Sequence, residues 1–304
     1  MRYSLGLDVG GTRIKAACVS EFGALLEWRS VETPADGAWL HSVRETVLAL
    51  QQDLGAPALR VGVAAPGLAA RDGRSISFMP GRLPGLEGLD WTTFLNAPSP
   101  VQVLNDAHAA LAGESAFGAA AGLQDAIMLT LGTGVGGAIL SAGKIMTGHL
   151  GRAGHLGHIS LNPDGPPDIV NTPGSLEDAI GECTLQKRSN GAYSTTEALL
   201  EDAQKGVENA RAIWLRSVRA LACGIVSLIN VLDPEAVVIG GGIANAGSAL
   251  FDPLNATLDG IEWRPDGRRV KIVPAKLGEK AGALGAAHRA SVKVNDSIKA
   301  FFDY

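Results

Sequence analysis

The sequence predicts an α/β fold of two domains, and two features of its 304 residues lead to this prediction. Apolar runs of strand length alternate with stretches of helical periodicity, which is typical of α/β proteins. A strand–glycine turn–strand unit near the N-terminus is repeated from about residue 125, which indicates an internal duplication. The length suits two domains of ordinary size. We place them at residues 1–115 and 116–304, with the last helix packing back on the first domain.

The first half of the chain is expected to begin with a hairpin and to end in a strand–helix junction. The spacing of apolar residues predicts a helix between these features, because it follows a helical repeat. The expected elements are strands at 3–9 and 14–19 around a Gly-Gly-Thr turn, a helix at 38–54, a strand at 58–67 ending in Pro-Gly, and a strand-then-helix at 100–120 that changes at Asn105 and Asp106.

The second half repeats the opening pattern and then becomes mostly helical. The expected elements are a strand–turn–strand unit from 125 to a Gly-Lys turn at 143–144, helices at 175–182 and 194–232, a buried strand at 235–242, a helix from about 245, a strand at 269–277 and a last helix at 281–294. Strands alternating with helices again favour an α/β domain.

Composition excludes several classes of protein. The formal net charge is −5 and the pI is about 5.7, so no global positive field attracts nucleic acid or an anionic membrane. The three cysteines, Cys18, Cys183 and Cys223, are far apart and form no CxxC pair, which favours a reduced setting. The N-terminus lacks the pattern of a signal peptide, and no apolar run approaches the ~20 residues that span a bilayer. These features predict a cytoplasmic protein without nucleic-acid or membrane partners.

The first glycine turn, LDVGGTRIK, has the residues of a phosphate-binding loop. Gly10 and Gly11 allow a phosphate close to the backbone N–H groups, and Thr12 adds a hydroxyl donor. Lys15 could reach a phosphate or pair with a carboxylate, and Asp8 could hold Mg²⁺ directly or through water. An ordinary glycine-rich hairpin is the alternative for this turn taken alone.

The second turn, LGTGVGG, matches the G-x-G-x-x-G pattern of dinucleotide-binding proteins. That pattern requires a helix at the turn and an acidic residue about 20 positions later. A short strand follows Gly132, Thr133 and Gly134 instead, and the next Asp is Asp164, which lies too far along. We therefore reject a dehydrogenase and interpret the turn as a second phosphate loop.

A third cluster, Gly240, Gly241 and Gly242, ends a buried strand and opens a helix. Backbone amides at such a helix start suit the phosphates of an adenosine nucleotide. Close packing between strand and helix is the alternative reason for these glycines.

Together these motifs resemble the ROK family of bacterial sugar kinases and repressors over nearly the whole chain. The matching segments are LGLDVGGTRIK, VLNDAHAALAGE at 103–114, LGTGVGGAIL, GHLGRAGHLGH at 148–158, VVIGGGIA and GEKAGALGAA at 278–287. The resemblance implies the actin/hexokinase-like, ribonuclease H-like duplicated fold, ATP and Mg²⁺ as cofactors, a sugar substrate and a homo-oligomer, expected to be a dimer. Repressors of this family carry a DNA-binding domain before the first phosphate loop. Here that loop begins by residue 8, so we do not expect a DNA-binding repressor.

The resemblance also implies which residues bind the acceptor. Asp106 would accept the proton of the attacking hydroxyl, which phosphoryl transfer requires, although an Asp at a strand–helix junction is often a helix cap. Asn105, His158 and Glu177 would hold sugar hydroxyls. Glu177 could instead be a charge at a helix start, and His158 an ordinary buried histidine.

The sequence departs from the family at several of these positions. In family kinases three cysteines bind zinc together with the histidine that matches His158. The three cysteine positions are Asp168, Val170 and Ser175 in this sequence. We therefore expect no zinc and a loop braced by its prolines and turns. His155 replaces a sugar-binding glutamate and Arg82 an asparagine, which makes the acceptor pocket more positive or neutral.

These observations predict an ATP-dependent sugar kinase, with glucokinase as the default. A kinase for another sugar, a sugar acid or a cyclitol is the alternative within this class. A sugar-binding ATPase or regulator without phosphotransfer is the alternative from another class.

Overall fold

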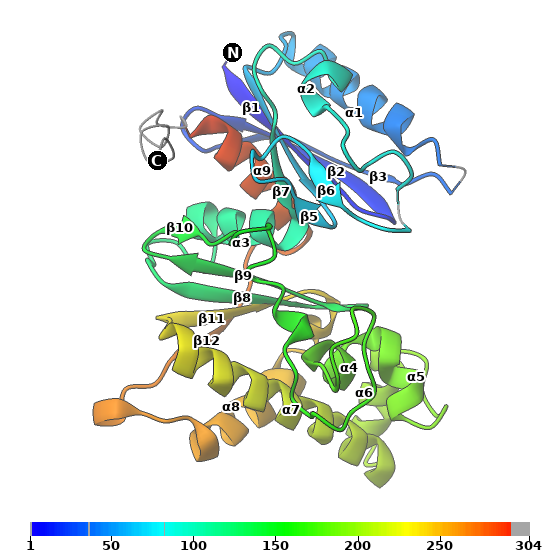
Figure 1. Ribbon diagram of the computed structural model, residues 1–304, viewed down its shortest axis with the longest axis vertical. Coiled ribbons are helices and arrows are strands. Elements are labelled where there is room, and N and C mark those ends of the chain that lie inside the picture. The colour runs from blue at the N-terminus through cyan, green and yellow to red at the C-terminus, as the bar shows by residue number, and fades with distance from the viewer. Residues whose placement is uncertain (1, 36, 82, 293–304) are drawn as a thin grey trace. The chain divides into compact units, whose positions relative to one another are not determined.

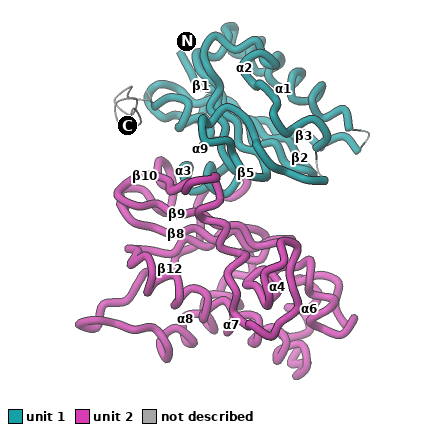
Figure 2. Tube along the Cα trace, in the orientation of Figure 1, with its two compact units in different colours: residues 1–113, 280–304 teal, residues 114–279 magenta. Residues whose placement is uncertain are grey.

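The computed structural model describes residues 2–35, 37–81 and 83–292, and the chain divides into two compact units (Figures 1 and 2). Unit 1 contains Met1–Gly113 and Lys280–Tyr304, whereas unit 2 contains Glu114–Glu279. Each unit has its own mixed sheet and its own hydrophobic core.

Unit 1 is built on a five-stranded sheet of order β3-β2-β1-β4-β7. Strands β3, β2 and β1 are antiparallel, while β4 and β7 continue the sheet parallel to β1. The strands are β1 (Tyr3–Val9), β2 (Arg13–Ser20), β3 (Leu25–Glu32), β4 (Arg60–Ala65) and β7 (Gln102–Asn105), with a separate ribbon of β5 (Leu68–Ala69) and β6 (Ile76–Phe78). The helices are α1 (Trp39–Leu54), α2 (Trp91–Phe94), α3 (Asp106–Phe117), whose last residues from Glu114 on belong to unit 2, and α9 (Ala281–Ser291).

The last helix, α9, packs on β1 and β4 of unit 1. Glycines allow the close approach: a Cβ on Gly6 would lie 1.9 Å from the Ala283 carbonyl oxygen, and one on Gly62 would lie 2.1 Å from that of Ala286. Any larger side chain on these strands would push the helix away. The sequence-predicted end of this helix, beyond residue 292, lies outside the described residues.

Unit 2 repeats the sheet of unit 1 with the order β10-β9-β8-β11-β12 and the same strand directions. Its strands are β8 (Ala126–Leu131), β9 (Val135–Ser141), β10 (Lys144–Ile145), β11 (Ala236–Gly240) and β12 (Lys271–Pro274). The α-helices are α4 (Leu176–Ile180), α5 (Leu185–Arg188), α6 (Thr196–Gln204), α7 (Glu208–Leu232) and α8 (Ser248–Ile261). Short 3₁₀ helices are η1 (Leu156–His158), η2 (Glu182–Thr184), η3 (Gly242–Ala246), η4 (Pro265–Gly267) and η5 (Gly278–Lys280), the last of which spans the point in the sequence where unit 2 ends and unit 1 resumes. The predicted α/β duplication is thereby confirmed.

The helix predicted at 194–232 is two helices, α6 and α7. The chain breaks at Gly206, whose φ of +87° is incompatible with a right-handed helix and easily adopted by glycine. Sequence periodicity missed this break, because the apolar repeat resumes immediately after it. It also missed β3, whose residues are only partly buried.

Helix α7 is the central helix of the unit 2 core. Its 25 residues are long and apolar enough to cross a membrane by length and composition alone, contrary to the expectation from the sequence. However, 56% of its apolar window is buried inside the protein, and Ile213, Val218 and Ile225 belong to the core cluster. This burial is what a core helix requires.

Candidate active site

The turn between β1 and β2 exposes two backbone amides. The Gly10 amide donates to the Arg13 carbonyl oxygen at 2.9 Å, and Thr33 donates to two carbonyls of the turn, from its amide to Thr12 and from its hydroxyl to Gly10. Within the described ranges, the amides of Gly11 and Thr12 donate to no protein acceptor. A turn with two such N–H groups can bind an anion.

Asp8 and Lys15 face each other across β1 and β2, immediately behind this turn. Their side chains are largely buried, and the Lys15 Nζ lies 3.5 Å from the Asp8 Oδ2. Of the two roles that the sequence left open for Lys15, pairing with a carboxylate is therefore present. Burial, and to a lesser extent the nearby Asp106 carboxylate, raise the pKa of Asp8 to about 6 against the opposing effect of Lys15. Two neighbouring carboxylates form a donor set that fits Mg²⁺.

Asn105 and Asp106 lie where β7 ends and α3 begins. The buried Asn105 caps the helix, because its Oδ1 accepts from the amides of Ala107 at 2.9 Å and His108 at 3.3 Å. Its Nδ2 donates to the Gly67 carbonyl oxygen at 3.0 Å, which leaves one N–H for a ligand. Asp106 is exposed and accepts from the Ala107 amide at 2.8 Å. The cap considered for Asp106 thus falls mainly to Asn105.

The turn between β8 and β9 repeats the arrangement in unit 2. The Gly132 amide donates to the Gly134 carbonyl oxygen, while the amides of Glu182 and Cys183 donate to the carbonyls of Gly132 and Thr133 at 3.0 and 2.8 Å. In the part of the chain that the structure describes, the amides of Thr133 and Gly134 have no protein acceptor. The support from Glu182 and Cys183 could not be predicted, since it comes from a segment about 50 residues away.

Glu177 on α4 is joined to this second turn. Its Oε2 accepts from the Val135 amide at 2.9 Å, and a Cβ on Gly134 would lie only 2.3 Å from the same oxygen. Ser175 caps α4 by accepting from the Asp178 amide at 3.2 Å. One carboxylate oxygen of Glu177 is therefore used by the protein, and Oε1 is left for a ligand.

His155 and His158 lie at the two ends of η1. His155 precedes the helix and His158 ends it, so the two histidines lie about one turn apart in the chain. The helix packs tightly on β9, because a Cβ on Gly157 would lie 1.9 Å from the Val135 carbonyl oxygen. His158 Nδ1 lies 2.8 Å from the Asp168 Oδ2. Unit 2 therefore gathers the second turn, both histidines and Glu177 around β9.

The third glycine cluster begins at Gly240, the last residue of β11. Gly241 has a φ of +88°, and a Cβ there would lie 2.2 Å from the Leu131 carbonyl oxygen, so the chain requires glycine. Gly132 and Gly242 line one cavity of about 540 Å³, which joins two of the predicted loops. Its other lining residues, which the sequence did not reveal, are Glu182, Thr196, Glu197, Leu200, Glu201, Gln204, Ile243, Asn245 and Ala246. Most of them lie on α6 and η3, whose helical patterns carry no recognisable motif.

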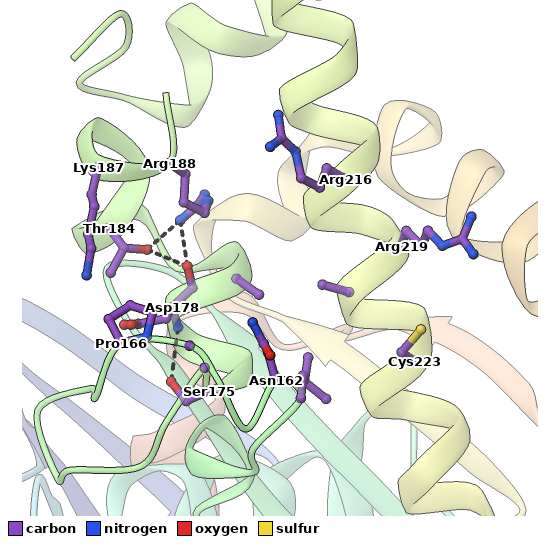
Figure 3. Close-up of a pocket in the computed structure, with 15 residues that line it drawn as sticks. Asn162, Pro166, Ser175, Asp178, Thr184, Lys187, Arg188, Arg216, Arg219 and Cys223 are labelled. Carbon is purple, nitrogen blue, oxygen red and sulfur yellow. Dashed lines mark hydrogen bonds between the residues drawn. The ribbon is translucent and has the colours of Figure 1, made fainter. Parts of the chain in front are cut away.

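A second cavity of about 570 Å³ lies in unit 2 among α4, α5, α7 and the loop before α4 (Figure 3). None of the predicted binding residues that the structure describes lines it. Arg188 lies at its edge and donates to the Gly181 carbonyl oxygen at 2.6 Å, after the end of α4. This is a structural contact with the end of a helix. Arg82 lies outside the described residues.

The residues at the family's zinc positions do not form a zinc site. Asp168 and His158 provide one carboxylate and one imidazole, whereas Val170 has no donor atom. Across residues 2–35, 37–81 and 83–292, no group of three or more His, Cys, Asp or Glu side chains could hold a metal ion. Structural zinc requires four ligands, so this donor set does not fit it.

Comparison with known proteins places the chain among sugar kinases. The family model of the ROK family matches residues 4–292. The glucokinase of Streptomyces coelicolor is 32% identical, covering 94% of this chain and 97% of the relative. The N-acetylmannosamine kinase of Escherichia fergusonii is also 32% identical, covering 93% and 97%. The crystal structure of a ROK family glucokinase from Streptomyces griseus with glucose and AMPPNP superposes with a TM-score of 0.76 at 31% identity, covering 95% and 99%.

Proposed function

The chain belongs to the ROK family and has its actin/hexokinase-like fold, and we propose that it is an ATP-dependent sugar kinase with Asp106 as general base. The observation that carries this proposal is the junction of β7 and α3. There an exposed carboxylate stands beside a buried, fully oriented asparagine, in the same unit as the first phosphate turn. A general base must be accessible and its neighbours fixed.

In this mechanism the sugar hydroxyl oxygen attacks the γ-phosphorus, its proton passes to Asp106, and ADP leaves. The free N–H of Asn105 donates to a sugar oxygen, and Glu177 accepts from a hydroxyl through Oε1. His155 and His158 bind further hydroxyls from η1. A role for Arg82 at the sugar remains part of the proposal from the sequence alone.

Backbone amides would hold the phosphates of the nucleotide. Those of Gly11 and Thr12 in unit 1, and those of Thr133 and Gly134 in unit 2, would donate to phosphate oxygens, and the cavity that reaches Gly242 would receive the adenosine. Lys15 holds the Asp8 carboxylate in place beside the phosphates. Asp8 would hold Mg²⁺, directly or through water, and that ion neutralises phosphate charge when it is bound.

The acceptor is proposed as a hexose, with glucose as the default. The two curated relatives are named for glucose and for N-acetylmannosamine at equal identity, so they do not decide between these sugars. His155 in place of a glutamate replaces a charged acceptor by one donor and one acceptor, which keeps a sugar acid or a cyclitol as alternatives.

We further propose a cytoplasmic homodimer without nucleic-acid or membrane partners, and we take units 1 and 2 as the two predicted domains. The net charge of −5 supports the absence of nucleic acid.

A coupled ADP-release assay against glucose, N-acetylmannosamine, other hexoses, a sugar acid and inositol tests this function. We expect ADP release that depends on one sugar and produces an equal amount of sugar phosphate. ADP release that is independent of every acceptor would favour the sugar-binding ATPase instead. Binding of sugar without any ADP release would favour the regulator.

A further inference from the structure

The loop before α4 folds around a buried carboxylate. Residues 159–175 return on themselves through two backbone bridges, between Ser160 and Ser175 and between Pro167 and Pro173. Asp168 lies within this loop with its side chain fully buried. From the sequence we expected the prolines and turns to brace this loop. The structure adds the buried side chain of Asp168, which contacts several groups of the loop.

Two backbone amides, one ring nitrogen and one hydroxyl surround the Asp168 carboxylate. Oδ1 accepts from the amides of Val170 at 2.9 Å and Thr172 at 2.8 Å, while Oδ2 lies 2.8 Å from His158 Nδ1. The Ser175 side chain also hydrogen-bonds to it. Burial alone would raise the pKa of Asp168, but these hydrogen bonds outweigh burial and hold the pKa below its ordinary value. Asp168 is therefore ionised near neutral pH.

An ionised carboxylate can only accept hydrogen bonds, so the facing nitrogen of His158 must carry the proton. A neutral His158 then has its hydrogen on Nδ1 and a lone pair on Nε2. A metal at this place would impose the opposite requirement, because a nitrogen that binds a metal must be deprotonated. Replacing the metal by an anion therefore sets the tautomer of this ring.

Ser175 extends the contact to α4. Its hydroxyl bonds to Asp168 and also accepts from the Asp178 amide, as Figure 3 shows for the second bond. Glu177 lies on the same helical turn and accepts from the Val135 amide. The two side chains proposed to bind sugar in unit 2, His158 and Glu177, are thus connected through one carboxylate and one hydroxyl.

We infer that Asp168 is a positioning residue for the acceptor: it takes the place of a structural metal and fixes His158 as the Nδ1–H tautomer, so that Nε2 accepts a hydrogen bond from a substrate hydroxyl. The identity of the bound hydroxyl rests on the proposed function. The tautomer of His158 is inferred from the contacts of Asp168 alone. Outer partners that orient a ligand-binding histidine typically change affinity or activity when removed.

The first test is a ¹H–¹⁵N spectrum of the histidine rings in the full chain at pH 8, in which His158→Asn identifies the signal. We expect a ring protonated at Nδ1 and unprotonated at Nε2. The reverse tautomer would overturn the inference. This measurement needs no substrate, so it is decisive even if no sugar is phosphorylated and the proposed kinase function fails.

The second test compares Asp168→Asn with Asp164→Asn, an exposed carboxylate in the same loop. In Asp168→Asn, the side-chain NH₂ group faces backbone N–H groups or the His158 ring N–H, which are also donors. We expect its acceptor KM to rise about 10–100-fold with the KM for ATP within about twofold, and its His158 tautomer to change. The Asp164 variant should match the unaltered protein in every reading.

A purely structural role predicts a different result: Asp168→Asn would lower the melting temperature without changing the acceptor KM or the tautomer, and this would overturn the inference. If Asp168→Asn does not fold, Ser175→Ala takes its place. It removes one hydrogen bond from Asp168 and also the cap of α4, so the His158 ring spectrum is recorded beside the acceptor KM. Its acceptor KM should rise, and Ser175→Thr, which keeps the hydroxyl, should restore it. An unchanged KM in Ser175→Ala would count against the inference.

Discussion

The two sheets have the same strand order and directions, but they differ in charge at equivalent places. Asp8, next to the last residue of β1, is paired in register with Lys15. Thr130, next to the last residue of β8, is paired with Gly136. Both hairpins nevertheless leave two turn amides without an acceptor among the described residues. The duplication therefore repeats the backbone of the turn, and of these two paired positions only the one in unit 1 is charged.

The strand ends differ in the same way. In unit 1, β7 ends at Asn105 and is followed by Asp106, whereas β12, its counterpart in unit 2, ends at Pro274 and is followed by an alanine. Unit 2 instead presents Glu177 and two histidines around its turn. In the proposed function, unit 1 carries the proton transfer through Asp106 and holds a sugar oxygen through Asn105, whereas the side chains of unit 2 only bind and orient. The following predictions test this division.

The largest effect is expected from Asp106→Asn. Removing a general base acts on the transition state, so kcat should fall about 10²–10⁴-fold while ATP affinity stays nearly unchanged. Glu177→Gln in unit 2 should chiefly raise the acceptor KM. Steady-state kinetics with the best acceptor measures both.

A matched control is Asp90→Asn, which makes the same change at the start of another helix. Asp90 caps α2 through Oδ1, and an asparagine oxygen can keep that cap. Its kcat should equal that of the unaltered protein. If Glu177→Gln lost as much turnover as Asp106→Asn at constant KM, the division of roles between the units would be wrong.

The second prediction concerns the charged pair itself. The pKa of Asp8 is about 6 in the folded protein against 3.8 as its ordinary value, so the folded state binds this proton more tightly. The contribution of Asp8 to stability is then greatest below pH 4 and is lost as pH rises toward 6, by about 3 kcal/mol. Asp8→Asn should remove this loss.

Chemical denaturation of the ligand-free protein between pH 4 and pH 7 checks this sign. The unfolding free energy of Asp8→Asn should gain on that of the unaltered protein as pH rises. Thr130→Val, at the equivalent place in unit 2, should keep a constant difference. If the unfolding free energy of Asp8→Asn fell relative to that of the unaltered protein as pH rises, the effect of Lys15 on the pKa of Asp8 would outweigh burial, and the folded state would stabilise Asp8 as a carboxylate.

Sequence reasoning succeeded where a local pattern has a local structural cause. Gly10 and Gly132 occur in short turns between strands, and Asn105 stands where a strand pattern becomes a helical one. It failed where the contact depends on chain segments that meet only in the fold. Glu182 supports the second turn from a different element, and Asp168 reaches His158 through a loop that reverses twice. The sequence showed Asp168 only as a missing cysteine.

The third prediction separates the two turns by their neighbours. An added methyl at Gly134 would lie 2.3 Å from the Glu177 Oε2, so Gly134→Ala should displace that carboxylate and its bond to Val135. We expect the unfolding free energy to fall by about 1 kcal/mol and the acceptor KM to rise about tenfold. Gly11→Ala in unit 1 and Gly132→Ala in unit 2 meet no neighbour within 4 Å and should leave the unfolding free energy unchanged. Equal destabilisation by all three variants would show that Glu177 is not the cause.

The smallest effect is expected from metal removal, which tests whether a carboxylate has replaced zinc in unit 2. Protein purified without added zinc should contain well under one zinc per chain, and a strong chelator should leave the melting temperature unchanged. The reason is that Asp168 already satisfies His158, Ser175 and two loop amides, so that a cation has no open ligand set to enter. The triple variant Asp168→Cys, Val170→Cys and Ser175→Cys supplies the positive control, because with His158 it offers the four ligands of a structural site. It should bind one zinc per chain and lose stability on chelation. Stoichiometric zinc in the unaltered protein would show that the loop is held by a metal and that the Asp168–His158 contact is secondary to it.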